Sequence, residues 1–488
     1  MPSSARSGNG PYWEERAIFV QESIGVVPIK NEIRKGSTTF MGYDLVVIGA
    51  GPGGHAAAGE SARLGAKVAI VERDKWGGIC THCGCIPTKA LLACSKKYVD
   101  IKKLKRIGIT VGEPSFDFSV MKRHQNQMVR VSSLGVQKTL KETGVECIEG
   151  EGILVSPEDV EVVASDGKKK KIRSKHIVIA WGSKPAMLPN VEFSNRVLSS
   201  TGLLSMDTLP ESIIVVGGGA IGVEFATVLA ELGTKVVLLE LMDQILPNEE
   251  REAAGFLEGE LKKLGIDVHT STAIDLIEEM DDGVCIRAKC KDSNREFSAE
   301  YVLICVGREP ALRTGELDRL SIGYDRRGIK VNERFMTNVE NIFAVGDTTG
   351  GILLAHRAMA QGRALASDLF GNGSITYSDG TIPAVVYTHP NVARVGMTEE
   401  QAKKEGLEIE VEKVEYGGNI IARTGLMGNG FVKTLFSDEI LIGVTIAGDE
   451  AGELIAPMSL AVVNKMTIQQ LRNWVIPHPT LSELLRVI

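Results

Sequence analysis

The chain has 488 residues, 43% of them apolar and 5% aromatic, which is enough for about three globular domains of ordinary size. Its formal net charge is −7, and its basic residues form no cluster larger than residues 168–171, so the sequence excludes the basic surface that binds nucleic acid or an anionic membrane. No stretch reaches the roughly 18 to 20 apolar residues of a membrane-spanning helix.

Residues 1–40 precede the first predicted strand, and we interpret them as an N-terminal extension of unknown role. They lack the apolar core of a signal peptide. They also contain four glutamates, whereas organelle transit segments are poor in acidic residues. We therefore expect a cytoplasmic protein.

A first βαβ unit follows this extension. The apolar run Tyr43–Ile48 predicts a buried strand, which leads into the glycine-rich turn 49–54. A helix of small residues follows to about residue 65, and a second strand over residues 67–71 delivers Glu72. A strand, a GxGxxG turn and a helix in this order form the phosphate-binding end of a dinucleotide site.

The pattern assigns a role to each glycine of this turn. Gly49 would make the tight turn, Gly51 would let the backbone approach a pyrophosphate, and Gly54 would allow the helix to pack closely. Glu72 would accept a hydrogen bond from a ribose hydroxyl.

Three of the eight cysteines lie within residues 80–85. In a reducing cytosol such crowding indicates metal binding or catalysis more often than a structural disulfide. If a helix begins near Cys85, the thiols of Cys80 and Cys85 can close a ring across its first turn, where the helix dipole stabilises a thiolate. The alternative is a zinc or iron–sulfur site that includes Cys83, although the sequence has no second Cys-x-x-Cys or histidine pair to complete four ligands.

A second βαβ unit repeats the first. Strand Ser212–Val216 leads into the glycine-rich turn 217–222, and strand Lys235–Leu239 delivers Glu240. The acidic residue follows the first glycine by 23 residues in both units. A single GxGxxG is weak evidence, but two copies in matched contexts predict two dinucleotide sites. The carboxylate of Glu240 would bond the ribose 2′-hydroxyl of NAD and would repel the 2′-phosphate of NADP. No arginine that could hold that phosphate directly follows Glu240.

The C-terminal part of the chain has a different pattern. Short apolar strands over residues 301–306 and 341–345 end in polar turns. From about residue 381 the chain forms short strands, at 430–436 and 440–446, and then amphipathic helices. This order predicts a separate α+β domain.

These motifs resemble those of the pyridine nucleotide–disulfide oxidoreductases, and within them the branch that oxidises dihydrolipoamide. The redox loop of that family, GGxCxxxxCIPxKALL, is matched by residues 77–92, and its C-terminal HPTLSE is matched by residues 478–483. Further family motifs are matched by residues 344–347, 353–356 and 387–390. The likeness covers nearly everything after Met41.

The resemblance implies an α/β fold with two Rossmann-like domains, one for FAD and one for NAD, and a C-terminal α+β dimerisation domain. The expected segments are the extension 1–40, the first part of the FAD domain 41–187, the NAD domain 188–311, the second part of the FAD domain 312–380, and the dimerisation domain 381–488.

The resemblance also implies that Cys80 and Cys85 form a redox disulfide, with Cys80 meeting the substrate and Cys85 facing the flavin. Lys89 and Glu224 would form an ion pair near the reactive nitrogen of the flavin. From the residues alone, Glu224 could instead lie on a solvated helix face, and Lys89 could extend into solvent.

At the C-terminus the resemblance makes His478 the acid–base residue, oriented by Glu483 and supplied by the partner subunit, so it implies a homodimer. Spacing alone favours a simpler role for Glu483 in a capping box with Thr480. A histidine between two prolines is also more often a surface residue than a catalytic one.

The remaining cofactor contacts are implied by the resemblance, and no metal is. For FAD they are the first glycine unit with Glu72 and then Lys89, Gly152, Trp181, Gly182, Ser183, Asp347, Leu353, Leu354, Ala355 and His356. For NAD they are Gly217, Gly219, Gly222, Glu224, Glu240, Ala273 and Gly307.

We therefore hypothesise an enzyme that oxidises protein-bound dihydrolipoyl groups with NAD, serving a 2-oxo acid dehydrogenase complex or the H protein of glycine cleavage. The alternatives are an NAD(P)H-dependent reductase of another disulfide and a non-catalytic flavoprotein subunit of a complex. The chain departs from the family pattern at residues 81–83, at Trp181 and at residues 476–477. Among these, Cys83 could be an alternative disulfide partner.

Overall fold

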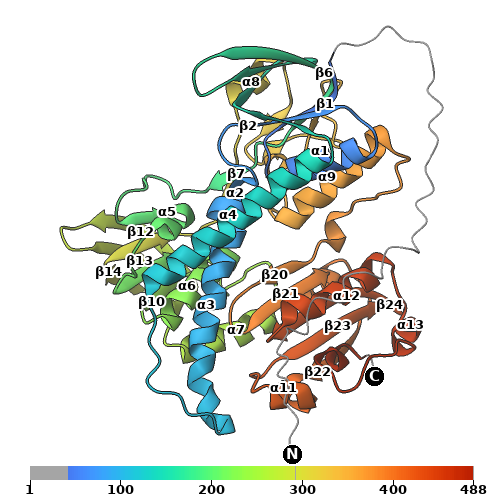
Figure 1. Cartoon of the computed structure of the whole chain (residues 1–488). Coiled ribbons are helices and arrows are strands. Elements are labelled where there is room, and N and C mark those ends of the chain that lie inside the picture. The colour runs from blue at the N-terminus through green and yellow to red at the C-terminus, as the bar shows by residue number, and fades with distance from the viewer. Residues whose placement is uncertain (1–41, 292, 487–488) are drawn as a thin grey trace, which may run out of the picture. The chain divides into compact units, whose positions relative to one another are not determined.

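The computed structural model describes residues 42–291 and 293–486. The predicted extension, residues 1–40, lies outside the described residues. The described chain forms three main sheets with helices packed on them (Figure 1).

The first sheet has seven strands in the order β3-β2-β1-β6-β5-β4, and β19 also pairs with β6. β1, β2, β3 and β19 join it in parallel, whereas β5 and β4 continue from the other half of β6 as antiparallel strands. One face of the parallel part of this sheet packs on α1, α4 and α9. Its other face packs on α8 and on the antiparallel strands β4 and β5. Burial on both faces explains the continuous apolar run of β1. The strands are β1 Tyr43–Ile48, β2 Val68–Glu72, β3 Glu146–Glu149, β4 Glu151–Ser156, β5 Asp159–Val163, β6 Lys169–Ile179 and β19 Ile342–Ala344, and the helices are α1 Pro52–Arg63, α4 Phe118–Glu142, α8 Thr314–Arg319 and α9 Ala355–Phe370.

The second sheet is fully parallel, with the order β11-β10-β9-β15-β8. Its centre, β10-β9-β15, repeats the arrangement β2-β1-β6 of the first sheet. A three-stranded antiparallel sheet, β12-β13-β14, belongs to the same part of the chain. The elements are β8 Val197–Ser199, α5 Ser200–Ser205, β9 Ser212–Val216, α6 Ala220–Glu231, β10 Lys235–Leu239, α7 Arg251–Lys263, β11 Asp267–His269, β12 Thr272–Glu279, β13 Val284–Cys290, β14 Ser293–Ala299 and β15 Tyr301–Ile304.

The third sheet is antiparallel, with the order β20-β21-β24-β23-β22, and α12 packs on it. The last predicted helix is in fact a short 3-10 helix, η5. The elements are β20 Ala384–Val386, β21 Asn391–Gly396, α10 Glu399–Lys404, β22 Glu410–Glu415, α11 Ile420–Thr424, β23 Phe431–Ser437, β24 Ile440–Gly448, α12 Ala451–Val463, α13 Ile468–Arg472 and η5 Leu481–Leu485.

The three sheets draw their strands from separate predicted segments, but the segment boundaries themselves stay predictions. One small strand pair links two of the predicted segments, because β7 in segment 41–187 pairs with β16 near the end of segment 188–311. The remaining short elements are β7 Ser183–Pro185, β16 Arg308–Pro310, β17 Tyr324–Asp325, β18 Gly328–Ile329, η1 Leu104–Ile107, η2 Gly346–Thr349, η3 Asp379–Thr381 and η4 Tyr416–Gly418.

The cysteine-bearing helices are fixed by a shared core. The cysteines lie in α2, Gly78–Cys83, and α3, Cys85–Lys103. Leu91 and Leu92 of α3 belong to one apolar cluster with α6, α7 and β9, and also with Val386 and Phe431 of the third sheet. Within the described part of the chain, no helix is long and apolar enough to cross a membrane.

Candidate active site

A disulfide joins Cys80 and Cys85, whose Cα atoms are 4.7 Å apart. Cys80 lies in α2, whereas Cys85 is the first residue of α3. The expectation of a helix beginning near Cys85 is therefore met, but the disulfide spans a break between two helices at Gly84 instead of lying within one. Cys83 is a free, partly exposed thiol at the end of α2.

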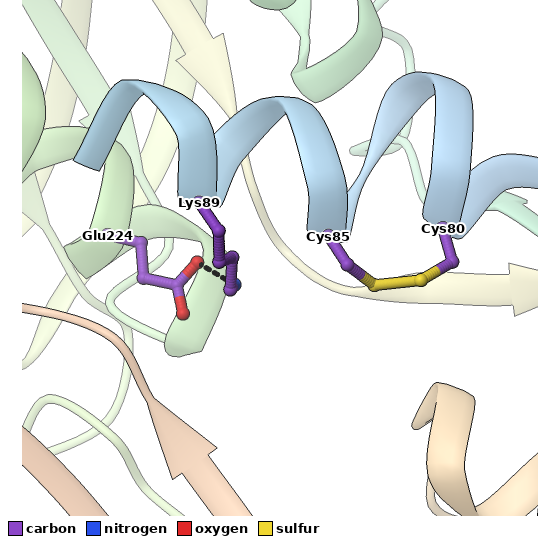
Figure 2. The surroundings of a disulfide bond; sticks show 4 residues. All are labelled: Cys80, Cys85, Lys89 and Glu224. Atoms are coloured by element: carbon purple, nitrogen blue, oxygen red, sulfur yellow. Dashed lines mark hydrogen bonds and ion pairs between the residues drawn. A yellow bond between two sulfur atoms is a disulfide. The ribbon is translucent and has the colours of Figure 1, made fainter. Parts of the chain in front are cut away.

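One turn beyond the disulfide, Lys89 forms an ion pair with Glu224 of α6. Figure 2 shows the side chains of Cys80, Cys85 and Lys89 on the same side of their helices. The Lys89 Nζ and Glu224 Oε2 atoms are 2.7 Å apart, and the side chains are 35% and 6% exposed, respectively. The alternatives of a solvated Glu224 and of a Lys89 that extends free into solvent are therefore wrong.

Tyr387 completes this ion pair, although the sequence did not indicate it as a site residue. Its backbone N–H donates to Glu224 Oε1 at 3.0 Å, and its ring centroid is 4.5 Å from Lys89 Nζ. Burial raises the pKa of Tyr387, and the carboxylates of Glu224 and Glu453 add to this shift. The available signal was the family motif at residues 387–390, which does not reveal the contact.

A second set of polar contacts, centred on Glu231, joins α3, α6 and the segment that contains Tyr387. The imidazole Nδ1 of His389 lies 2.9 Å from Glu231 Oε1, and the Ser95 hydroxyl donates to Glu231 Oε2 at 2.5 Å. Glu231 is on α6 and Ser95 is on α3. α3 and α6 are thus joined at two positions, by Lys89–Glu224 and by Ser95–Glu231, and residues 387–389 contact the α6 carboxylate at each.

The two glycine turns have the same construction. A Cβ on Gly49 would collide with the Ala180 carbonyl oxygen, and a Cβ on Gly54 would collide with the Gly49 carbonyl oxygen. In the second turn, Gly217 and Gly222 have the corresponding collisions with Cys305 and Gly217. By contrast, a Cβ on Gly51 or on Gly219 would meet nothing within 4 Å. The middle glycine of each turn therefore faces open space, as a backbone that receives a pyrophosphate requires.

Each glycine turn is also held by an acidic residue at the end of the second strand of its unit, Glu72 within β2 and Glu240 directly after β10. Glu72 is the last residue of β2, and its Oε2 accepts from the Ala50 N–H at 2.7 Å. The Oε2 of Glu240 accepts from the Gly218 N–H at 2.6 Å, and its Oε1 accepts from the Met242 N–H at 2.7 Å. These hydrogen bonds fix each carboxylate beside the backbone of its glycine turn.

Asp347 belongs to a polar chain that the sequence showed only in part. The Ser183 hydroxyl donates to Asp347 Oδ2 at 2.6 Å, and Arg308 donates from Nε to the Ser183 hydroxyl at 2.8 Å. Burial lowers the pKa of Arg308, whereas the charges of Asp347 and Cys83 act in the opposite direction. Arg308 was missed, although it directly follows the predicted Gly307.

The other predicted cofactor residues lie at several kinds of position. Gly182 and Gly307 have positive φ values of 75° and 117°, with nothing within 4 Å of an added Cβ. An added Cβ on Gly152 would touch Ile48 and Val71, so this glycine has a packing role. The rest are Trp181, whose buried Nε1 has no partner among the described residues, Leu353 and Leu354 just before α9, Ala355 and His356 at its start, and Ala273 on β12.

His478 and Glu483 are in contact near the C-terminus. The His478 Nδ1 is 3.1 Å from both carboxylate oxygens of Glu483, and the His478 side chain is 74% exposed. The Thr480 N–H also donates to Glu483 at 3.2 Å, so the capping interaction and the histidine contact coexist. The hydrogen bond with His478, followed by that with Thr480, lowers the pKa of Glu483.

Comparison with known families identifies this arrangement. Residues 43–362 match the pyridine nucleotide-disulphide oxidoreductase family, and residues 382–487 match its dimerisation domain. The chain belongs to this family. It is therefore an oxidoreductase, and the second match supports a homodimer.

Individual members of the pyridine nucleotide-disulphide oxidoreductases agree over most of their length. The chain is 38% identical to a dihydrolipoyl dehydrogenase of Geobacillus stearothermophilus over 445 residues, which cover 90% of this chain and 94% of that protein. It is also 38% identical to a dihydrolipoyl dehydrogenase of Bacillus subtilis, with the same coverage. The crystal structure of LpdA from Mycobacterium tuberculosis has a TM-score of 0.85 at 26% identity, over 91% of this chain and 98% of that one.

The family uses FAD and NAD(H), and the residues present fit both groups. Each glycine turn leaves room above its middle glycine, and each is followed by a helix whose N-terminus is not capped by a side chain. Free backbone N–H groups at such a terminus bind a pyrophosphate. The individual contact residues remain predictions.

Proposed function

We propose that the chain is a dihydrolipoyl dehydrogenase, which oxidises a protein-bound dihydrolipoyl group and delivers the electrons to NAD⁺. The observation that carries this proposal is the Cys80–Cys85 disulfide, one turn before the partly buried Lys89–Glu224 pair. The identity of 38% to relatives named dihydrolipoyl dehydrogenase supports the choice of substrate.

The first half-reaction is a thiol–disulfide exchange on the chain's own cysteines. Neutral His478 of the partner subunit accepts a proton from the substrate dithiol, and the substrate thiolate attacks the sulfur of Cys80. Cys85 leaves as a thiolate, and its place at the start of α3 lets the helix dipole stabilise that charge. The second substrate thiol then displaces Cys80, which yields the cyclic lipoyl disulfide and two reduced cysteines.

Other residues hold the cofactors in place. When bound, FAD would supply the two-electron chemistry that links the reduced cysteines to NAD⁺. Asp347, held by Ser183 and Arg308, would bind the ribityl chain of FAD. Glu240, fixed by two backbone N–H groups, would bond the ribose of NAD.

The proposed partners are a second copy of the chain and a lipoyl-bearing domain. Several apolar side chains on the C-terminal domain are exposed, including Leu460 at 65%, Val463 at 53% and Val475 at 87%. A dimer interface would cover such side chains. Val475 lies three residues before His478, so the same interface would present His478 to the other subunit. We further propose a cytoplasmic location, where a protein disulfide is usually catalytic and not structural.

The test is stopped-flow absorbance of the FAD-loaded protein. Dihydrolipoamide should produce a long-wavelength absorbance band, and NAD⁺ should then be reduced to NADH in step with its decay. NADP⁺ in the same experiment should be reduced far more slowly, because Glu240 repels its 2′-phosphate. An absorbance spectrum that stays unchanged under excess dihydrolipoamide would exclude the proposed function.

A further inference from the structure

Three helices of the first sheet, α1, α4 and α9, border a cavity of about 320 Å³. This volume lies at the lower end of the roughly 300–1,000 Å³ that small-molecule sites occupy. None of its lining residues is among those predicted for FAD, NAD or the dithiol. The residues that matter are His55, Gly59, Arg63, Gly135, Met359 and Arg363.

Two glycines within helices leave this space open. Gly59 is in α1 and Gly135 is in α4, where glycine is the poorest helix former except proline. Neither has a positive φ, and a Cβ on either would meet nothing within 4 Å. Backbone conformation and packing therefore do not require glycine at these positions, and larger side chains there would fill the cavity.

His55 forms part of the cavity wall. Burial lowers the pKa of its ring, and the nearby positive charge of Arg363 lowers it further, whereas the Ala50 and Gly51 carbonyls act in the opposite direction. The ring is therefore neutral at neutral pH and adds no charge to that of the arginines. Its Nδ1 atom is buried within the protein and does not face the cavity.

Two guanidinium groups supply positive charge at the same place. Arg63 makes a single contact of 3.3 Å with Glu60, which leaves most of its donors available. In the part of the chain that the structure describes, no carboxylate pairs with Arg363. Guanidinium groups bind phosphate and carboxylate through paired hydrogen bonds. The remaining wall is formed by the apolar side chains of Ala56, Val136, Leu140 and Met359 and by Thr139.

We propose that this cavity binds a small organic anion, with a phosphate or carboxylate at the two arginines and a compact apolar body against α4 and Met359. The neutral ring of His55 would form part of the wall around the same ligand. The site is independent of the dithiol chemistry, so its test does not depend on the proposed function.

The test is calorimetry on the FAD-loaded protein with saturating NAD⁺, which keeps both dinucleotide sites filled. Phenyl phosphate is the main probe, benzoate tests the carboxylate, and phenol and inorganic phosphate test each half alone. We expect one phenyl phosphate or benzoate per chain, and at least 10-fold weaker binding of phenol and of inorganic phosphate.

Two variants connect this binding to the cavity. Arg363→Gln removes the unpaired charge, and Gly59→Leu fills the space with a better helix former; each should weaken binding at least 10-fold. Lys404→Gln, on the exposed surface of α10, is the charge-matched control and should bind as the wild type does. Retained FAD and an unchanged melting temperature would show that Gly59→Leu is folded, and Arg363→Gln provides the test if it is not.

Two results would overturn the proposal. One is the absence of saturable binding by either phenyl phosphate or benzoate. The other is binding that Arg363→Gln leaves unchanged, or that Lys404→Gln weakens equally, since either would indicate general attraction to positive surface charge.

Discussion

At the scale of single residues, the redox loop holds three thiols, and the structure pairs two of them. Cys83 lies in the same short helix as Cys80 but remains free. We predict that Cys80→Ser abolishes dihydrolipoamide oxidation, because the substrate thiolate then has no disulfide to attack. Cys83→Ser should retain the wild-type rate within about 2-fold, as should the control Cys94→Ser on α3. Steady-state NADH formation measures all three.

A large loss of activity in Cys83→Ser alone would contradict this assignment. It would mean that Cys83 exchanges with the disulfide during turnover.

Tyr387 offers a second prediction at this scale. Its contacts with the ion pair use the backbone N–H and the ring face. Tyr387→Phe should therefore keep the wild-type rate and the wild-type pH profile, since the raised pKa already keeps the phenol protonated near neutrality. Tyr387→Leu removes the ring from Lys89 and should shift both the FAD reduction potential and the pH profile of kcat.

Potentiometric titration of bound FAD distinguishes this positioning role from a purely structural one. If Tyr387→Leu lowers stability but leaves the potential and the pH profile unchanged, Tyr387 has no role in positioning the ion pair.

The residue-scale comparison shows where sequence reasoning ends. The disulfide and the glycine turns depend on neighbours in the chain, so local motifs reveal them. Tyr387 and Arg308 act through partners more than 100 residues away, Glu224 and Ser183, respectively. No periodicity or spacing encodes such a pair. A motif can indicate that a segment belongs to a functional site without indicating which atoms of that segment contact which partners.

At the scale of elements, α3 and α6 are joined by the Lys89–Glu224 ion pair, whose two side chains differ in exposure to solvent. Glu224 is 6% exposed, whereas Lys89 is 35% exposed. Lys89→Met leaves a buried carboxylate with only the Tyr387 N–H, and should lower the free energy of unfolding by about 2–3 kcal/mol, below the usual range for a fully buried pair. Glu224→Gln keeps a hydrogen-bond acceptor and lets Lys89 reach water, so it should cost about 1 kcal/mol.

Urea unfolding of the FAD-loaded protein measures this difference. Lys97→Met is the matched control, since Lys97 is exposed on the same helix, and it should change stability by less than about 0.5 kcal/mol. Equal losses for Lys89→Met and Lys97→Met would show that the pair contributes no stability.

The elements themselves were predictable to different degrees. β1, β9 and β10 have the bounds expected from sequence. β1 and β9 are buried strands that run directly into glycine turns, and the apolar run of β10 ends at Glu240, so the end of each strand is sharply defined. The break between α2 and α3 was not expected. It depends on the backbone of Gly84, with φ −147° and ψ −111°, and a glycine within a helical pattern does not by itself specify a break.

At the scale of the whole molecule, sequence predicted two repeated units and a third domain, and the fold class is confirmed. What it could not predict is how the parts meet. The core cluster that joins α3 to the third sheet depends on Leu91, Val386 and Phe431, which are ordinary apolar residues in their own segments. Such residues are typical of any core, so their partners become visible only in the folded chain.

The proposed dimer makes a last prediction, because each active site would combine the disulfide of one subunit with His478 of the partner subunit. Cys80→Ser and His478→Gln should each remove most activity, the latter by about 100- to 10,000-fold, as expected for loss of an acid–base group. If the two inactive variants are unfolded together and refolded, half of the dimers should be mixed. One site in each mixed dimer then has both a normal disulfide and a normal histidine, so about a quarter of the wild-type activity should return.

Refolding each variant alone is the control and should recover no more than the residual activity of that variant. Stronger dilution should lower the recovered activity, since the complete site exists only in the dimer. One variant carries an affinity tag, and co-purification of the untagged variant shows that mixed dimers have formed. If mixing still restores nothing, His478 must act on the disulfide of its own chain. An interface that includes Val475 would then not bring His478 to the disulfide of the other subunit.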